Sequence, residues 1–150
     1  MITFGRWGVI AVAVVCGCAS APGPSSRDTF NVRLTAGPQN AGQVGEASFT
    51  AQGDATNIVL FLSGVPERVT RPVHLYTYIY EGTCGNLSPK PVYSLNDVIL
   101  ARVTSSSGPG FTLDKLAPVP LQKLRSGGYA IAVRTQAPDL DEEMFCGNIR

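Results

Sequence analysis

Histidine and charged residues are scarce in this 150-residue chain. His74 is the only histidine, and Lys, Arg, Asp and Glu together make up 15% of the sequence, with a formal net charge of +1. A nucleic-acid-binding domain carries a strongly basic patch, so this composition argues against nucleic acid as a partner. Zinc sites normally take three or four protein ligands, so a single histidine is too few for a site built from imidazoles.

The signature motifs of several enzyme classes are also missing. The sequence contains no P-loop, no GxGxxG, no CxxC and no GxSxG elbow. His74 with a nearby hydroxyl therefore lacks the context of a serine hydrolase. The acidic run DLDEE at 139–143 could offer oxygen ligands to Ca²⁺, but we favour a solvated loop there. We expect no catalytic residue, no metal site and no cofactor, and hence a protein that is not an enzyme.

The N-terminal segment predicts a lipoprotein signal. Arg6 precedes an apolar run from Trp7 to Val15, too short for a membrane span of about 20 residues but suited to the core of a secretion signal. The run leads into VCGC at 15–18, which resembles a bacterial lipobox, so we expect Cys18 to be lipidated and to become the mature N-terminus. The alternative is an ordinary signal peptide cut nearby, after CAS or ASA.

Such an anchor would set both location and charge. Residue 19 is Ala rather than Asp, which in the lipoprotein pattern indicates the outer membrane, with the domain facing the periplasm or the cell surface. Residues 18–29 would be the lipidated cysteine and a flexible tether rich in Pro and Ser. Loss of residues 1–17 removes Arg6, and 12 − 1 leaves 11 Lys and Arg against 11 Asp and Glu. The mature domain would not steer charged ligands over a distance.

The four cysteines reduce to one pair. Cys16 leaves with the leader and Cys18 carries lipid, so only Cys84 and Cys146 remain. In the oxidising periplasm we expect them to form a disulfide, with two free buried thiols as the alternative. Closing a loop of about 62 residues should stabilise the fold by about 4 kcal/mol in the chain-entropy model.

Residues 30–150 predict one all-β domain. Apolar and polar residues alternate in FNVRLTA at 30–36, the period-two pattern of a half-buried strand, and 16 Gly and 11 Pro indicate many turns. The other predicted strands lie at 46–52, 57–65, 73–81, 97–104, 111–114, 128–136 and 145–149. PLQKLRSGG at 120–128 predicts one short helical turn. Seven to eight antiparallel strands without a long amphipathic helix favour a β-sandwich or flattened barrel.

One strand carries a row of tyrosines in the stretch YTYIYEGTC at 76–84. Its odd positions are aliphatic or β-branched and are the better core candidates: Val73, Leu75, Thr77 and Ile79. The even face then lies outside, under the loop that begins at Cys84: His74, Tyr76, Tyr78 and Tyr80. Exposed, this row could bind an envelope protein or a glycan. Covered by the loop at 82–96 it would be structural, which is the interpretation we favour.

Four motifs, in their order, resemble a known family. HLYTYIYEGTC (74–84), PVYSLNDV (91–98), LRSGGYAIAV (124–133) and FCGNI (145–149) look like the copper/zinc superoxide dismutase-like β-sandwich group, most closely its bacterial CHRD-like members. These typically read H-I-H-x-G-x-C, then G-x-Y-A-I-x-V-H, then C-G-x-I. The resemblance covers roughly residues 30–149. It implies a Greek-key β-sandwich in which the bridge between Cys84 and Cys146 pins the long loop to the last strand.

The same resemblance places metal ligands where this chain has other residues. The family's His-x-His falls on Tyr78 and Tyr80, and its later histidine on Arg134. A phenol with a pKa near 10 is a poor ligand at neutral pH, and arginine stays protonated. Glu143 stands where dismutases carry a substrate-guiding arginine. We therefore expect the scaffold without its metal site, and a cation–π contact between Arg134 and one of these tyrosines.

The expected function is that of a non-enzymatic outer-membrane lipoprotein, held to the membrane through Cys18. Its metal-free domain would act as a binding or structural module in the envelope. The candidate binding surface consists of His74, Tyr76, Tyr78, Tyr80 and Arg134. The alternative is a periplasmic metal-binding or redox protein that uses His74 with tyrosine or carboxylate oxygens.

Overall fold

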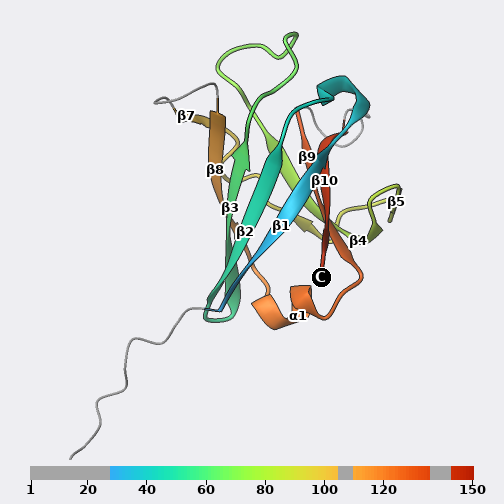
Figure 1. The fold of residues 1–150 in the computed structure, drawn as a ribbon. Helices are drawn as coiled ribbons and strands as arrows, with labels where there is room; N and C mark the ends of the chain where they lie inside the picture. The colour runs from blue at the N-terminus through green and yellow to red at the C-terminus, as the bar shows by residue number, and fades with distance from the viewer. Residues whose placement is uncertain (1–27, 105–109, 136–142) are drawn as a thin grey trace, which may run out of the picture.

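The computed structural model describes residues 28–104, 110–135 and 143–150 (Figure 1). The predicted lipidation site, Cys18, and residues 139–142 of the acidic run lie outside these ranges. Within the described ranges, no helix is long and apolar enough to cross a membrane.

The described chain forms ten β-strands, the short helix α1 (Leu121–Arg125) and a 3₁₀ turn at Pro38–Asn40. The strands are β1 Thr29–Ala36, β2 Gly45–Gln52, β3 Ala55–Leu62, β4 Tyr76–Thr83, β5 Asn86–Leu87, β6 Tyr93–Ser94, β7 Arg102–Thr104, β8 Gly110–Ala117, β9 Tyr129–Arg134 and β10 Glu143–Ile149. The predicted all-β fold with one helical turn is confirmed. The predicted strand number was too low because the two-residue strands β5 and β6 form inside the predicted loop and pair with β4.

The strands form two antiparallel layers that share β1. One layer has the order β1-β2-β3-β8-β7 and the other β1-β10-β9-β4, with β5 and β6 added to β4. On the far side, the N–H of Leu75 donates to the carbonyl of Ile99, and that of Ala101 to the carbonyl of Val73. The chain entering β4 thus lies beside the chain entering β7. The order β9-β4-β7-β8 that results is a Greek key.

The core lies between the two layers because alternate residues of each strand point inward. On β3, for example, Ile58, Leu60 and Leu62 are buried, whereas Val59 and Phe61 are exposed. The predicted inner face of the tyrosine strand is confirmed as buried: Val73, Leu75, Thr77 and Ile79.

At two places where the layers meet, neighbouring strands separate along part of their length, and we call these places seams. At the β1–β10 seam the two strands pair only at Thr35–Cys146 and Ala36–Phe145, although β1 runs along β2 from Thr29. At the β8–β7 seam, β7 pairs with residues 110–112, while β8 continues to Ala117 without it. A hollow of about 330 Å³ lies at the first seam and one of about 250 Å³ at the second.

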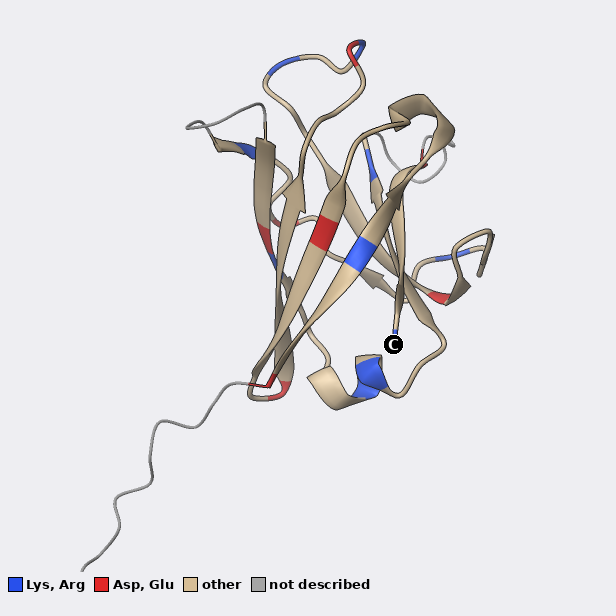
Figure 2. Ribbon diagram, viewed as in Figure 1, with Lys and Arg blue, Asp and Glu red and all other residues tan. Residues whose placement is uncertain are grey.

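Helix α1 holds the start of the domain. Asp28 accepts hydrogen bonds at both carboxylate oxygens from Nη1 of Arg125, at 2.9 Å each. The guanidinium carbon of Arg125 also lies 5.1 Å from the ring centroid of Phe30. Asp28 and the start of β1 therefore lie beside α1. Charges of both signs are scattered over the described strands, with Arg33 on β1 opposite Glu46 on β2 (Figure 2).

Candidate functional site

The tyrosine row lies on the outer face of the layer formed by β4, β9 and β10, and the register with β9 decides what it meets. Tyr78 is opposite Ala132, and Tyr80 is opposite Ala130. Both alanines are fully buried. Their small side chains leave room for the tyrosine rings to pack over β9 rather than stand out into solvent.

Most of the candidate surface is buried. Tyr78 and Tyr80 are each only 4% exposed, and with Ala132 they form a small apolar cluster separate from the main core. Tyr76 and Leu87, the latter from the predicted covering loop, pack against it and complete what we call the tyrosine cluster. The rings of Tyr78 and Tyr80 are 6.1 Å apart and inclined at 54°, a tilted geometry that aromatic pairs favour.

Burial also keeps the central phenol protonated. The pKa of Tyr78 is raised above its usual value, mainly because burial disfavours the phenolate; a side-chain hydrogen bond with Asn96 acts in the opposite direction. Asn96 itself is held in place because its Oδ1 accepts the N–H of Thr77 at 2.8 Å. A protonated phenol is a weak metal ligand, so this residue does not replace an imidazole.

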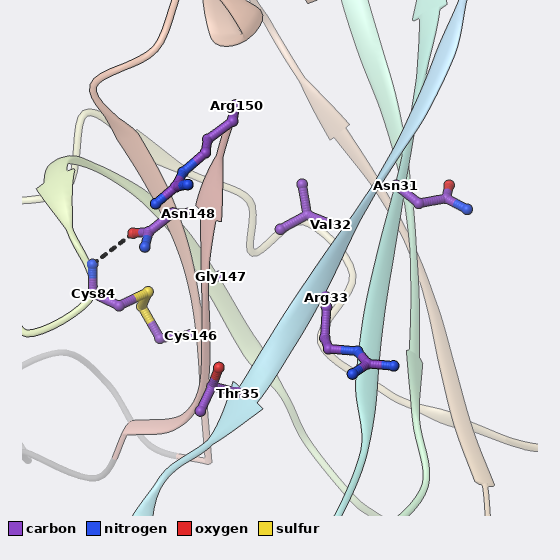
Figure 3. Close-up of a pocket in the computed structure, with 9 residues that line it drawn as sticks. All are labelled: Asn31, Val32, Arg33, Thr35, Cys84, Cys146, Gly147, Asn148 and Arg150. Carbon is purple, nitrogen blue, oxygen red and sulfur yellow. Dashed lines mark hydrogen bonds between the residues drawn. A yellow bond between two sulfur atoms is a disulfide. The ribbon is translucent and has the colours of Figure 1, made fainter.

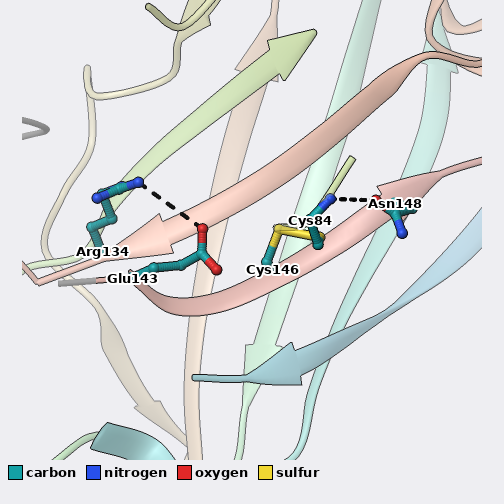
Figure 4. Close-up of a disulfide and its surroundings, with 5 residues drawn as sticks. All are labelled: Cys84, Arg134, Glu143, Cys146 and Asn148. Carbon is teal, nitrogen blue, oxygen red and sulfur yellow. Dashed lines mark hydrogen bonds and ion pairs between the residues drawn. A yellow bond between two sulfur atoms is a disulfide. The ribbon is translucent and has the colours of Figure 1, made fainter. Parts of the chain in front are cut away.

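Arg134 is part of the same packed region. It is 7% exposed, and its guanidinium carbon lies 5.9 Å from the ring centroid of Tyr80, so the predicted cation–π contact is confirmed. Its Nη2 is 4.0 Å from a carboxylate oxygen of Glu143, the residue opposite it on β10 (Figure 4). Glu143, which the sequence placed in an acidic loop, is therefore the first residue of a strand and faces an arginine.

The predicted disulfide is present. Cys84 and Cys146 are bonded, with their Cα atoms 5.9 Å apart. The N–H of Cys84 donates to Oδ1 of Asn148 at 2.8 Å, so a second contact ties the same turn to β10 (Figure 4). Together these contacts hold the chain that follows β4 against the last strand, next to the tyrosine cluster.

The hollow of the β1–β10 seam opens beside this disulfide (Figure 3). Thr35 and Arg33 lie on the β1 side, and Asn148 and Arg150 on the β10 side. No carboxylate is among the side chains that line it. Its lining offers positive charge and hydrogen-bond donors rather than the acidic oxygens that hard cations prefer.

His74 lies at the rim, apart from the buried tyrosines. It is exposed and sits opposite Leu100, which is 50% exposed, in an isolated β-bridge. The structure therefore brings together Tyr76, Tyr78, Tyr80 and Arg134, and leaves His74 at the exposed end of the row.

These residues do not fit the copper and zinc that the resemblance implies. Tyr78 and Tyr80 pack against each other, and Arg134 contacts Tyr80 and Glu143. Arginine cannot ligate, and one exposed imidazole does not make a three- or four-ligand site. Among the described residues, no group of three or more His, Cys, Asp and Glu side chains could hold a metal ion.

The sequence analysis did not single out the buried lysine, Lys115. Only 111–114 was predicted as a strand, whereas β8 extends to Ala117 and carries the buried series Phe111, Leu113, Lys115 and Ala117. The alternation of buried residues places this lysine on the core-facing side of the strand. That placement could be predicted only if the strand was extended beyond residue 114.

No protein-family model, curated protein or solved structure matches the chain.

Proposed function

We propose that this chain is an outer-membrane lipoprotein, anchored through Cys18, whose superoxide dismutase-like β-sandwich serves the envelope as a non-enzymatic binding or structural module. One observation carries the proposal. The positions at which the resemblance expects imidazole ligands hold Tyr78, Tyr80 and Arg134, and these side chains pack against one another instead of lining a metal pocket.

Two further features agree with the scaffold part of the proposal. The Greek-key strand order is the arrangement that the resemblance implies. The bridge from Cys84 to Cys146 ties the long loop to the last strand, as the resemblance also implies. Both features concern the scaffold, and neither contributes a reacting group.

The exposed end of the tyrosine row is the part suited to contact a partner. This end carries His74 and the partly buried Tyr76. Leu100 lies opposite His74 on the neighbouring segment, which also carries Val98; these two residues are 50% and 54% exposed. Exposed aromatic and aliphatic side chains side by side are typical of interaction surfaces. An envelope protein or a glycan would meet this edge, and the buried Tyr78 and Tyr80 would support it from below.

Metal analysis of protein produced in the periplasm tests the loss of metal chemistry. We expect copper and zinc well below one equivalent, no superoxide dismutation, and no change in metal content in His74→Ala. Stoichiometric copper or zinc that is lost in His74→Ala would instead support a metal-binding or redox protein.

The anchor is tested separately by labelling cells with a palmitate analogue. We expect the label to be lost in Cys18→Ala and retained in Cys16→Ala, the matched control two residues away. Label that survives Cys18→Ala would remove the anchor from the proposal.

Proximity labelling in the intact envelope tests the binding role. Neighbours labelled by the wild-type protein should be lost from His74→Ala/Leu100→Ser and retained in Phe61→Ser, which changes an exposed aromatic on the other layer. Identical neighbours in all three proteins would leave only the structural role.

A further inference from the structure

Lys115 is a lysine on the core-facing side of a strand. It lies on β8 between the buried Leu113 and Ala117, opposite Ile58 of β3, and is itself 4% exposed. Charged side chains are rarely this buried, because removing an ammonium from water costs several kcal/mol unless partners compensate. This position therefore needs a physical reason beyond packing.

The reason lies at the β8–β7 seam, where backbone pairing stops. Nζ of Lys115 donates to the carbonyl of Val98 and, at 3.5 Å, to the carbonyl of Leu75. These two acceptors take two of the three positions on the nitrogen that are not bonded to carbon. The third position carries a proton in the ammonium and a lone pair in the neutral amine.

Lys115 also lines a hollow at this seam. The hollow holds about 250 Å³ and is lined by Lys115 together with Gln52, Asn57, Leu95, Asp97 and Asp114 among others. Burial lowers the pKa of Lys115 to about 8, while the charge of Asp97 acts in the opposite direction. At pH 7 about one tenth of such an amine is neutral, against less than about a thousandth for an ordinary lysine with a pKa near 10.4.

We propose that Lys115 is a carbonyl-reactive amine that takes up short aliphatic aldehydes from the hollow of the β8–β7 seam. The lone pair of Nζ attacks the carbonyl carbon, and the electron pair of the C=O π bond moves to the oxygen, which takes a proton from the amine. The carbinolamine then loses water as the C–O bond breaks and the nitrogen forms C=N. The products are one imine and one water; the imine nitrogen takes up one proton from solvent to become cationic, and no oxidant or reductant takes part.

The charges around the hollow favour an aldehyde over an acylating ligand. A protonated imine keeps the positive charge of Lys115, whereas an amide or a carbamate removes or reverses it. The other titratable side chains that line the hollow are Asp97 and Asp114, the latter paired with Arg102. An imine that stays cationic remains stabilised by the charge of Asp97. Its single N–H can still donate to the carbonyl of Val98, and only the longer contact with the carbonyl of Leu75 is lost.

Reductive alkylation of the folded wild-type protein tests the proposal. Acetaldehyde and cyanoborohydride are added at pH 7, and peptide mass spectrometry measures the rate of ethylation at each of the three lysines, Lys90, Lys115 and Lys123. We expect Lys115 to react at least about tenfold faster than the exposed Lys90 and Lys123. The preference should disappear in denaturant, where the three amines become equivalent.

A charge variant supplies a second readout. Asp97→Asn removes the group that raises the pKa of Lys115, so ethylation of Lys115 at pH 7 should accelerate several-fold while Lys90 and Lys123 do not change. Circular dichroism checks that the variant is folded. Ethylation of Lys115 that is slower than that of Lys90 and Lys123 in the folded wild type, and unaffected by Asp97→Asn, would overturn the proposal and leave Lys115 as a structural tie between strands.

Discussion

The two seams are closed by different chemistry. At the β1–β10 seam, the side chains of Leu34 and Val32 leave no room for a side chain at position 147, and a disulfide lies on the outer face. At the β8–β7 seam, the ammonium of Lys115 reaches carbonyls that β8 does not meet. The first closure depends on covalent bonding and close packing, and its stability should vary little with pH. The second depends on a buried titratable group, so its stability should follow pH.

Loss of the disulfide should have the largest effect. Cys84→Ser/Cys146→Ser frees a loop with a sequence separation of 62 residues. We expect the free energy of unfolding to fall by about 4 kcal/mol in the chain-entropy model, measured by urea denaturation. The reduced wild-type protein is the control and should unfold at a similar urea concentration. A loss below about 1 kcal/mol would mean that the non-covalent contacts of this seam suffice.

Gly147→Ala should disrupt the packing of β10 against the side chains of β1 without touching the disulfide. The added Cβ would lie 2.6 Å from Cδ2 of Leu34 and 2.8 Å from Cγ1 of Val32, so these side chains or the strand that carries them must shift. Overpacking of this kind costs about 1–3 kcal/mol, and urea denaturation measures it. Gly53→Ala, in a hairpin with open space around the added atom, is the matched control and carries backbone strain only, because its φ is +62°. Equal effects at both positions would contradict tight packing at Gly147.

The pH response should distinguish the second seam from the first. The pKa of Lys115 is lower in the folded state, so between pH 8 and 10.5 the unfolded chain binds more protons and stability rises with pH. From pH 7 to 9.5 this contributes about 2 kcal/mol, which Lys115→Met should lose. Urea denaturation at both pH values gives the difference, and a variant with the same rise as the wild type would disprove the role of Lys115.

The smallest effect is expected at the open end of the β1–β10 seam. Asp28→Asn removes the ion pair with Arg125, and both side chains are well exposed to solvent. Exposed pairs contribute about 0–1 kcal/mol, so thermal unfolding should shift by only a few degrees. The shift should shrink further in high salt, since screening weakens the wild-type pair. A large, salt-independent loss would show that Asp28 has a packing role.

Period-two alternation and cysteine counting predicted much of the fold. The strand predicted at 30–36 and the inner face of the tyrosine strand agree with the structure, because side-chain alternation is a local property of an extended chain. The strand predicted at 97–104 was too long: only Arg102–Thr104 pairs as β7, since the preceding residues leave β8 to join the chain entering β4. The local alternation of apolar and polar residues does not reveal that a strand changes its pairing partner.

The candidate site was predicted in its residue types but not in its exposure. Tyr78 and Tyr80 were correctly placed on the outer face, yet whether that face is open depends on Leu87 and on alanines that β9 supplies. Lys115 escaped prediction because its partners, Val98 and Leu75, are 17 and 40 residues away in the chain.

The sequence by itself determined the β class, the pairing of Cys84 with Cys146 and the lack of imidazoles at the positions that the resemblance assigns to metal. These follow from composition and from the identity of each residue. Only the tertiary structure decided which tyrosines are covered, where the layers part and which carbonyls Lys115 reaches. Those outcomes depend on contacts between distant segments, and such contacts exist only once the two layers have packed together.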